Sequence, residues 1–176
     1  MADSHKGGVI TEEIYNNYHF KLYPGVRNYI DSYVVPTACR DGFVHLGLGF
    51  RIYTDNPDTD QRTLHNATIQ FWSILSILTI NKLHQLIDKN GYQDNVKVIS
   101  SIYDSIYIEV DEDPTMIKWV NDNLIRCMTQ DFMPDQRIPN TAESEIGDSW
   151  ANLHKISNGA SLEEISEVIN KIRNPK

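Results

Sequence analysis

The chain has 176 residues, 40% of them hydrophobic and 23% charged, which excludes a disordered or fibrous protein and predicts one globular domain. Sixteen basic against 24 acidic side chains give a net charge of −8. Proteins that bind nucleic acid unaided are usually basic, so this balance argues against autonomous nucleic-acid binding and leaves a local contribution to a larger site open.

Cysteine content and hydropathy predict a reducing, non-membrane environment. Cys39 and Cys127 are too few for a disulfide framework, and we expect both to be buried thiols in a cytoplasmic protein. The most apolar run, residues 69–80, is shorter than the roughly 20 residues of a membrane span, so no membrane partner is expected.

The N-terminal third predicts a leader followed by two helices. Residues 1–9 are polar and contain two glycines, which is typical of a flexible leader. Thr11 is a candidate helix cap, and Pro24 should end or kink this helix before a second one that runs to about residue 35. Tyrosines at helical spacing are expected to be packing residues; they are Tyr18, Tyr29 and Tyr33.

A small hairpin and a polar loop should follow. Residues 43–46 and 51–53 have strand character, with glycines between them. Residues 54–60 (TDNPDTD) are rich in aspartate, but they lack the glycine and terminal glutamate of a calcium loop. A solvated turn is the preferred interpretation.

The longest helix is expected from a cap at Thr59 or Asp60 to about residue 90. Arg62, Asn66 and Gln70 recur every four residues, so they share one helical face. This pattern fits a solvated polar face, and it equally fits hydrogen-bond donors that reach into a nucleic-acid groove. Farther along lies a stripe of small residues that would let another element approach closely; it comprises Ser73, Ser76 and Thr79.

The central stretch predicts a second hairpin. Residues 96–102 and 106–110 are rich in β-branched and aromatic side chains and flank Tyr103, Asp104 and Ser105. Asp104 fits a simple turn former, and it also fits a carboxylate held on a rigid strand end, where it would bind a divalent metal.

The C-terminal third predicts a helix, a strand and a last helix. Asp113 followed by Pro114 is a strong helix start, residues 141–146 alternate like a strand, and Ser161 with Glu164 forms a capping box. The resulting order is typical of an α+β fold, in which helices cover a small antiparallel sheet.

Five segments stand in a characteristic order. They are residues 20–30 (FKLYPGVRNYI), 42–53 (GFVHLGLGFRIY), 62–70 (RTLHNATIQ), 102–110 (IYDSIYIEV) and 142–150 (AESEIGDSW). In this order they resemble YFxxYPGVxxYI, GYVET…GRRRY, RxxxNxPxQG, the motif C pattern VHDExxxEV and xExxxGxxW of family A DNA polymerases, the polymerase I type and its phage relatives. The resemblance implies that residues 10–155 are the C-terminal part of a polymerase palm with adjoining fingers helices, and that residues 156–176 add a C-terminal helix.

The resemblance also implies roles for individual residues. Asp104 would be one of two palm carboxylates that hold a pair of Mg²⁺ ions, which activate the primer 3′-hydroxyl and stabilise the pyrophosphate leaving group. Arg62 and Gln70 would contact the minor groove of primer–template DNA, with Asn66 supporting them. Trp150 would be a packing residue.

Three departures distinguish this chain from the family pattern. Tyr103 replaces the usual histidine beside the primer phosphate, where it would act as a catalytic and DNA-contacting residue without a positive charge. Ser105 replaces the usual glutamate and cannot supply a second carboxylate. Residues 71–72 (FW) replace Gly-Thr. We interpret these changes as a divergent phage branch rather than as inactivity.

The family's other catalytic aspartate, its nucleotide-binding fingers helix and its thumb have no counterpart in this sequence. We therefore expect the small subunit of a split phage polymerase, active in the host cytoplasm only with a larger polymerase chain, primer–template DNA and dNTP. An excised fragment of an intact polymerase is the other possibility.

Two functions of other classes remain open. One is a catalytically dead, palm-like adaptor that binds a partner protein. The other is a metal-dependent phosphohydrolase that combines Asp104 with the acids of residues 55–60.

Overall fold

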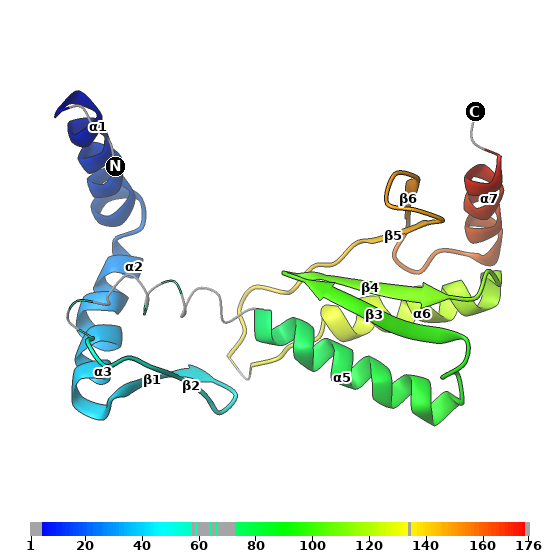
Figure 1. Cartoon of the computed structure of the whole chain (residues 1–176), viewed down its shortest axis with the longest axis horizontal. Coiled ribbons are helices and arrows are strands. Elements are labelled where there is room, and N and C mark those ends of the chain that lie inside the picture. The colour runs from blue at the N-terminus through cyan, green and yellow to red at the C-terminus, as the bar shows by residue number, and fades with distance from the viewer. Residues whose placement is uncertain are drawn as a thin grey trace. The chain divides into compact units, whose positions relative to one another are not determined.

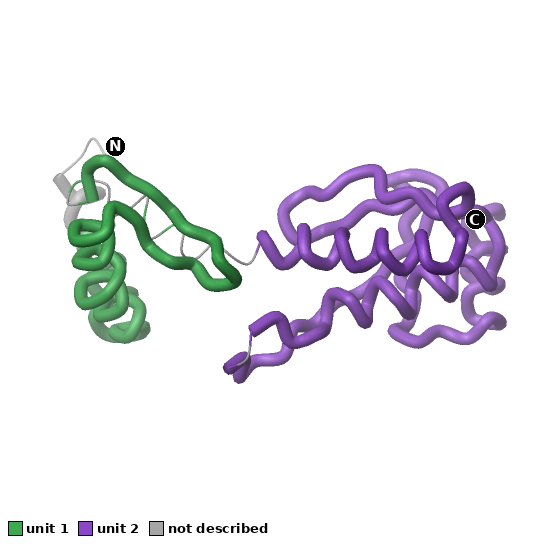
Figure 2. The backbone as a smooth tube through the Cα atoms, turned by 90° about the horizontal axis from the view of Figure 1, so that it is seen from below, with its two compact units in different colours: residues 1–71 green, residues 72–176 purple. Residues whose placement is uncertain are grey.

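The computed structural model describes the backbone of residues 5–57, 59, 64, 66, 73–133 and 135–174, with side chains from residue 11 onward. The chain divides into two compact units, Met1–Phe71 and Trp72–Lys176 (Figure 2), where the composition predicted one domain. Each hydrophobic cluster of the described residues lies within one unit, which explains the division. The fold is α+β with three two-stranded antiparallel sheets, in agreement with the predicted fold class.

The first unit begins with a chain of short helical segments. They are α1 (His5–Asn16), the π-helical η1 (Asn17–Leu22), α2 (Pro24–Tyr29), the π-helical η2 (Ile30–Val34) and α3 (Val35–Asp41). The helix predicted to start at Thr11 begins at His5, inside the expected leader. Pro24 opens α2 as its first residue, because the missing N–H of proline is tolerated there, and so it separates the segments as predicted.

The aromatic residues of these helices pack on one another but not in a buried core, since the Tyr29 and Tyr33 ring centroids lie 5.3 Å apart and those of Tyr18 and Tyr23 lie 4.9 Å apart. Tyr18, Tyr29 and Tyr33 are 44%, 44% and 41% exposed. Helical spacing placed them on a stripe, but the described residues of this unit do not cover that stripe. Desolvation by its partial burial, together with the neighbouring Tyr33, raises the pKa of Tyr29.

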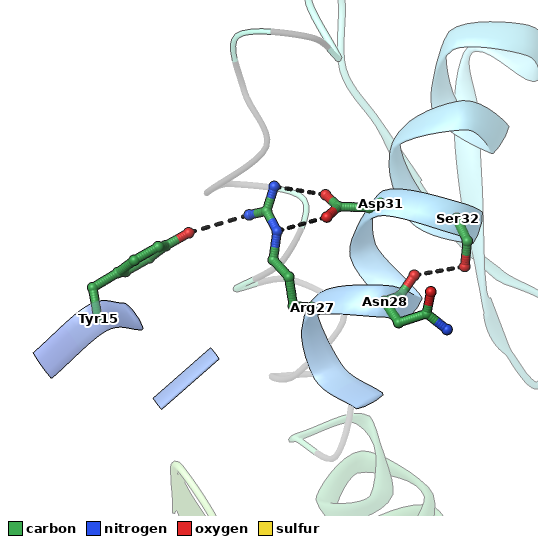
Figure 3. Close-up of polar contacts among 5 residues, drawn as sticks. All are labelled: Tyr15, Arg27, Asn28, Asp31 and Ser32. Carbon is green, nitrogen blue, oxygen red and sulfur yellow. Dashed lines mark hydrogen bonds and ion pairs between the residues drawn. The ribbon is translucent and has the colours of Figure 1, made fainter. Parts of the chain in front are cut away.

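Arg27 joins α1 to α2 and η2 through polar contacts (Figure 3). Its Nε donates to Asp31 Oδ2 at 2.7 Å, its Nη2 lies 2.6 Å from Asp31 Oδ1, and its Nη1 donates to the Tyr15 hydroxyl at 3.1 Å. A planar guanidinium suits this two-point contact with a carboxylate. One side chain thus links three helical segments, α1, α2 and η2.

The first hairpin follows α3 where it was expected. Strands β1 (Phe43–Gly47) and β2 (Phe50–Tyr53) are antiparallel, and Gly42 ends α3 with a left-handed φ of 76°. The core of this unit is a cluster of buried side chains packed on β1 and α3; its members are Val34, Ala38, Val44 and Leu64, with Ile52 beside them.

The second unit is built around the predicted central hairpin. Strands β3 (Val96–Ile102) and β4 (Ser105–Val110) pair antiparallel and lie along helices α5 (Ser73–Asn90) and α6 (Pro114–Met128) (Figure 1). The shared core is a cluster that includes Leu83, Ile87, Val96 and Val120. Asp113 caps α6, since its carboxylate accepts from the Thr115 N–H at 2.9 Å, as the sequence predicted.

The last elements form a third hairpin and a helix. Strand β5 (Ser144–Gly147) begins three residues after and ends one residue after its predicted bounds, and it pairs with β6 (Leu153–Ile156), which the sequence did not predict. Helix α7 (Leu162–Arg173) packs on α6 and β6 through a cluster that includes Ile117, Ile156, Ile165 and Ile169. None of the helices in the described ranges is long and apolar enough to cross a membrane.

Two finer predictions are only half correct. Ser161 caps α7 by accepting from the Glu164 N–H at 3.2 Å, but the Glu164 carboxylate accepts from the Ser157 N–H instead of closing the box on Ser161. Cys127 is buried and Cys39 is exposed, although both were expected to be buried.

Candidate functional site

The candidate site is the turn between β3 and β4. Ile102 pairs with Ser105, so Tyr103 and Asp104 form a two-residue loop, and both are exposed. Tyr103 has a φ of 54°, a left-handed conformation that costs a residue with a Cβ about 1–2 kcal/mol. Backbone strain of this kind is concentrated at functional sites, which supports the choice of this turn as the candidate site.

A bulge in β3 sets which side chains share a face near this turn. Val98 pairs with Ile108 and Ser100 with Tyr107, so Ile99 is the additional residue, and it is 62% exposed. Ile108 on β4 packs into the core between the hairpin and the helices. Tyr107 therefore lies on the outer face of the hairpin, because neighbouring strand residues alternate in direction.

The first turn of helix α5 contacts the β3–β4 turn. The buried Ser76 hydroxyl donates to the Tyr103 carbonyl at 3.4 Å, and Thr79 one turn later donates to the Cys127 carbonyl on α6 at the same distance. The small residues of α5 were predicted to let another element approach closely. Ser76 and Thr79 do so, for the β3–β4 turn and for α6, while Ser73 is exposed.

An aromatic pair covers part of the outer face. The Trp150 ring stacks on Tyr107 with centroids 4.8 Å apart and planes within 8° of parallel, while Trp150 remains 71% exposed. The prediction of a packing role for Trp150 thus holds for this contact, although most of the ring faces solvent. Alternation along β4 signals that Tyr107 faces outward, but no local pattern identifies Trp150 as its partner.

Asp104 presents one carboxylate at the end of this hairpin. Within the described ranges, no group of three or more His, Cys, Asp or Glu side chains is placed to hold a metal ion. A solvent-facing carboxylate is a suitable oxygen ligand for Mg²⁺, but the remaining ligands of a two-ion site would have to come from elsewhere.

The other predicted site residues belong to the first unit. Arg62 and Gln70 lie outside the described residues. Asn66 is exposed and has helical backbone, as does the buried Leu64, which agrees with the helix predicted there. Of the loop acids, Asp55 is exposed, and the residues at 58 and 60 lie outside the described part.

Comparisons with protein-family models, curated proteins and solved structures give no match for this chain.

Proposed function

We propose that this chain is part of a DNA-directed DNA polymerase, in which it forms the C-terminal portion of the palm and works only with a larger chain. The single observation that carries the proposal is the position of Asp104, an exposed carboxylate in the two-residue turn of a hairpin whose sequence resembles motif C. The order of the four other motif-like segments supports the same assignment.

The hydrogen bond from Ser76 to Tyr103 supports a joint role for the hairpin and the long helix. Arg62, Asn66 and Gln70 precede α5 in the sequence, and α5 itself contacts the turn that carries Asp104. In the sequence, Gln70 stands six residues before Ser76, the α5 residue that contacts the turn.

Within this proposal each residue has a defined task. Asp104 holds Mg²⁺, and Tyr103 lies beside the primer terminus with its hydroxyl available for a hydrogen bond. When bound, the metal pair activates the primer 3′-hydroxyl and neutralises the charge that develops on the leaving pyrophosphate. The larger chain supplies the second aspartate, the nucleotide-binding fingers helix and the thumb, and the assembly acts in the cytoplasm.

Exposed apolar residues near the turn offer a surface for that larger chain. Ile77, Ile99 and Ile102 are 54%, 62% and 42% exposed. Apolar side chains of this size exposed around one site are typical of protein–protein contacts. The same observation favours the second candidate, a palm-like adaptor that binds a partner protein without catalysing nucleotide transfer.

Primer extension distinguishes the two functions. The chain is co-purified with the polymerase-like chain of its source and assayed with Mg²⁺, as wild type and as Asp104→Asn. Asp94→Asn is the matched control, because Asp94 is an exposed aspartate just before β3, at the opposite end of the hairpin. A polymerase subunit predicts extension by the wild-type and Asp94→Asn complexes only.

Equal extension by the Asp104→Asn complex would assign the chain to the adaptor class. Metal-dependent phosphate release by the isolated chain would instead favour the phosphohydrolase.

A further inference from the structure

The outer face of the β1–β2 hairpin gathers aromatic and cationic side chains. Phe43 pairs with Tyr53 and His45 pairs with Arg51 across the two strands, so all four side chains share one face. The Phe43 ring centroid lies 5.0 Å from that of His45 and 5.6 Å from that of Tyr53. The Arg51 guanidinium carbon lies 4.5 Å above the Phe43 ring.

The opposite face of the hairpin fixes this arrangement. Val44 is fully buried, and its cross-strand partner Ile52 packs against the same cluster. A register slip would expose both residues, so the aromatic and cationic face is held outward by the core.

Most of the Tyr53 side chain is open to solvent. Its side chain is 69% exposed and contacts the Phe43 ring. A large, mostly open aromatic ring beside a cation has the features of a stacking surface for nucleobases, since every base offers a π-face to such a ring.

The charge of this face suits a phosphate-bearing ligand. In the described ranges, Arg27 is paired with Asp31 and Arg40 with Asp41, whereas Arg51 forms no ion pair with a described carboxylate. Asp41, which interacts electrostatically with His45, is already held by Arg40 through two hydrogen bonds of 2.8 Å. A cation–π contact does not use up N–H donors, so the Arg51 guanidinium can donate to a phosphate while it rests on Phe43.

We propose that this face binds single-stranded DNA, with a base stacked on Tyr53 and a backbone phosphate held by Arg51. The inference rests on the proposed function in one respect, because a polymerase must hold unpaired template. The binding surface lies on a different hairpin from Asp104 and involves no metal ion.

Fluorescence anisotropy with a labelled oligothymidylate of about twelve nucleotides tests the proposal at low salt. The net charge of −8 weakens DNA binding by the chain as a whole, but this local face should still bind the single strand at low salt, and more tightly than a duplex of equal length. Tyr53→Ala and Arg51→Ala should each weaken binding by at least about fivefold, because stacking on an aromatic ring contributes about that factor per base. Tyr53→Phe keeps the ring and should bind like the wild type, which would show that binding needs the ring and not the hydroxyl.

Two variants in the same unit serve as matched controls. Tyr23→Ala removes an exposed tyrosine that contacts Tyr18, and Lys21→Ala removes an exposed cation. Both should leave the affinity unchanged. Wild-type affinity in Tyr53→Ala or Arg51→Ala, or no single-strand binding by the wild type, would overturn the proposal.

Asp104→Asn separates the two proposals. It should abolish primer extension by the complex and leave oligothymidylate binding by this chain unchanged. Loss of binding in that variant would move the single-strand site to the β3–β4 turn and overturn the inference.

Discussion

The hydroxyl of Ser76 donates to the carbonyl of Tyr103 at 3.4 Å, and so links the first turns of α5 to the strained residue of the β3–β4 turn. This distance is long for a hydrogen bond, and its net contribution should be at the low end of the usual range. We expect Ser76→Ala to lower the free energy of unfolding by about 0.5 kcal/mol in urea titrations. Amide exchange at Asp104 and Ser105 should accelerate.

Thr79→Val is the control for this prediction, because Thr79 bonds to Cys127 on α6 and not to the turn. It should affect global stability without selectively accelerating exchange at the turn. Equal exchange at the turn in all three proteins would mean that the Ser76 contact does not hold it.

The positive φ of Tyr103 predicts a trade between stability and function. Glycine adopts this conformation without a steric penalty, so Tyr103→Gly should raise the unfolding free energy by up to about 1 kcal/mol after its larger backbone entropy is included. If Tyr103 contacts the primer terminus, the same variant should slow primer extension by the complex.

Leu48→Gly provides the comparison, since Leu48 is the other described non-glycine residue with a positive φ, at 50°, and it lies in the β1–β2 turn. It should give a similar gain in stability and no change in extension rate. A stabilised Tyr103→Gly complex that extends primers at the wild-type rate would remove Tyr103 from the proposed catalytic residues.

How much of the structure the sequence predicts depends on how local the signal is. The β3–β4 hairpin and the Asp113 cap were predicted because strand alternation and capping act over a few residues. The start of α1 was not, because Gly7 and Gly8 have low helix propensity and yet lie inside the helix. Strand β6 was missed because its sequence, LHKI, includes two polar residues in four and forms a strand only through its pairing with β5.

The candidate site follows the same rule. The sequence predicted that Asp104 lies in a turn, because the signal is local. The bulge at Ile99 and the stack of Trp150 on Tyr107 depend on tertiary contacts and were not predicted. The small side chain of Ser76 predicted a close neighbour but not which one. Exposure of tyrosines such as Tyr29 was misjudged, because helical spacing defines a face without saying what covers it.

Acid should destabilise the last helix through Glu164. The Ser157 N–H and hydroxyl lower the pKa of this carboxyl from its ordinary value of 4.5, so the folded state favours its ionised form. The stabilising contribution is therefore complete above about pH 4.5 and is lost as the pH falls from there through the lower pKa of the folded state.

Urea titrations between about pH 6 and 3 measure this dependence. Glu164→Gln should flatten the decline in unfolding free energy below about pH 4.5 and lower the unfolding free energy at neutral pH by about the amount that the wild type loses in acid, because the uncharged amide oxygen accepts less strongly from Ser157 than the carboxylate does. Glu167→Gln, on the same helix and without a hydrogen bond to a described residue, is the control. A decline of unchanged steepness in Glu164→Gln would refute the assignment.

Gly147 is required by close packing inside the β5–β6 hairpin. A Cβ at this position would lie 2.2 Å from the Asn152 carbonyl oxygen and 3.0 Å from the Asn152 carbonyl carbon, and backbone atoms cannot move aside as a flexible side chain can. Gly147→Ala should therefore force the turn open, displace Trp150 from Tyr107 and lower the unfolding free energy by about 2 kcal/mol or more.

Gly25→Ala is the matched substitution. Gly25 lies in helix α2 with nothing within 4 Å of an added Cβ, so alanine should leave stability unchanged or raise it by up to about 1 kcal/mol. The unfolding free energy and the tryptophan fluorescence of both variants report the result. A Gly147→Ala protein as stable as Gly25→Ala, with unchanged fluorescence, would mean that the β5–β6 turn relaxes without strain and that the Trp150 stack does not depend on it.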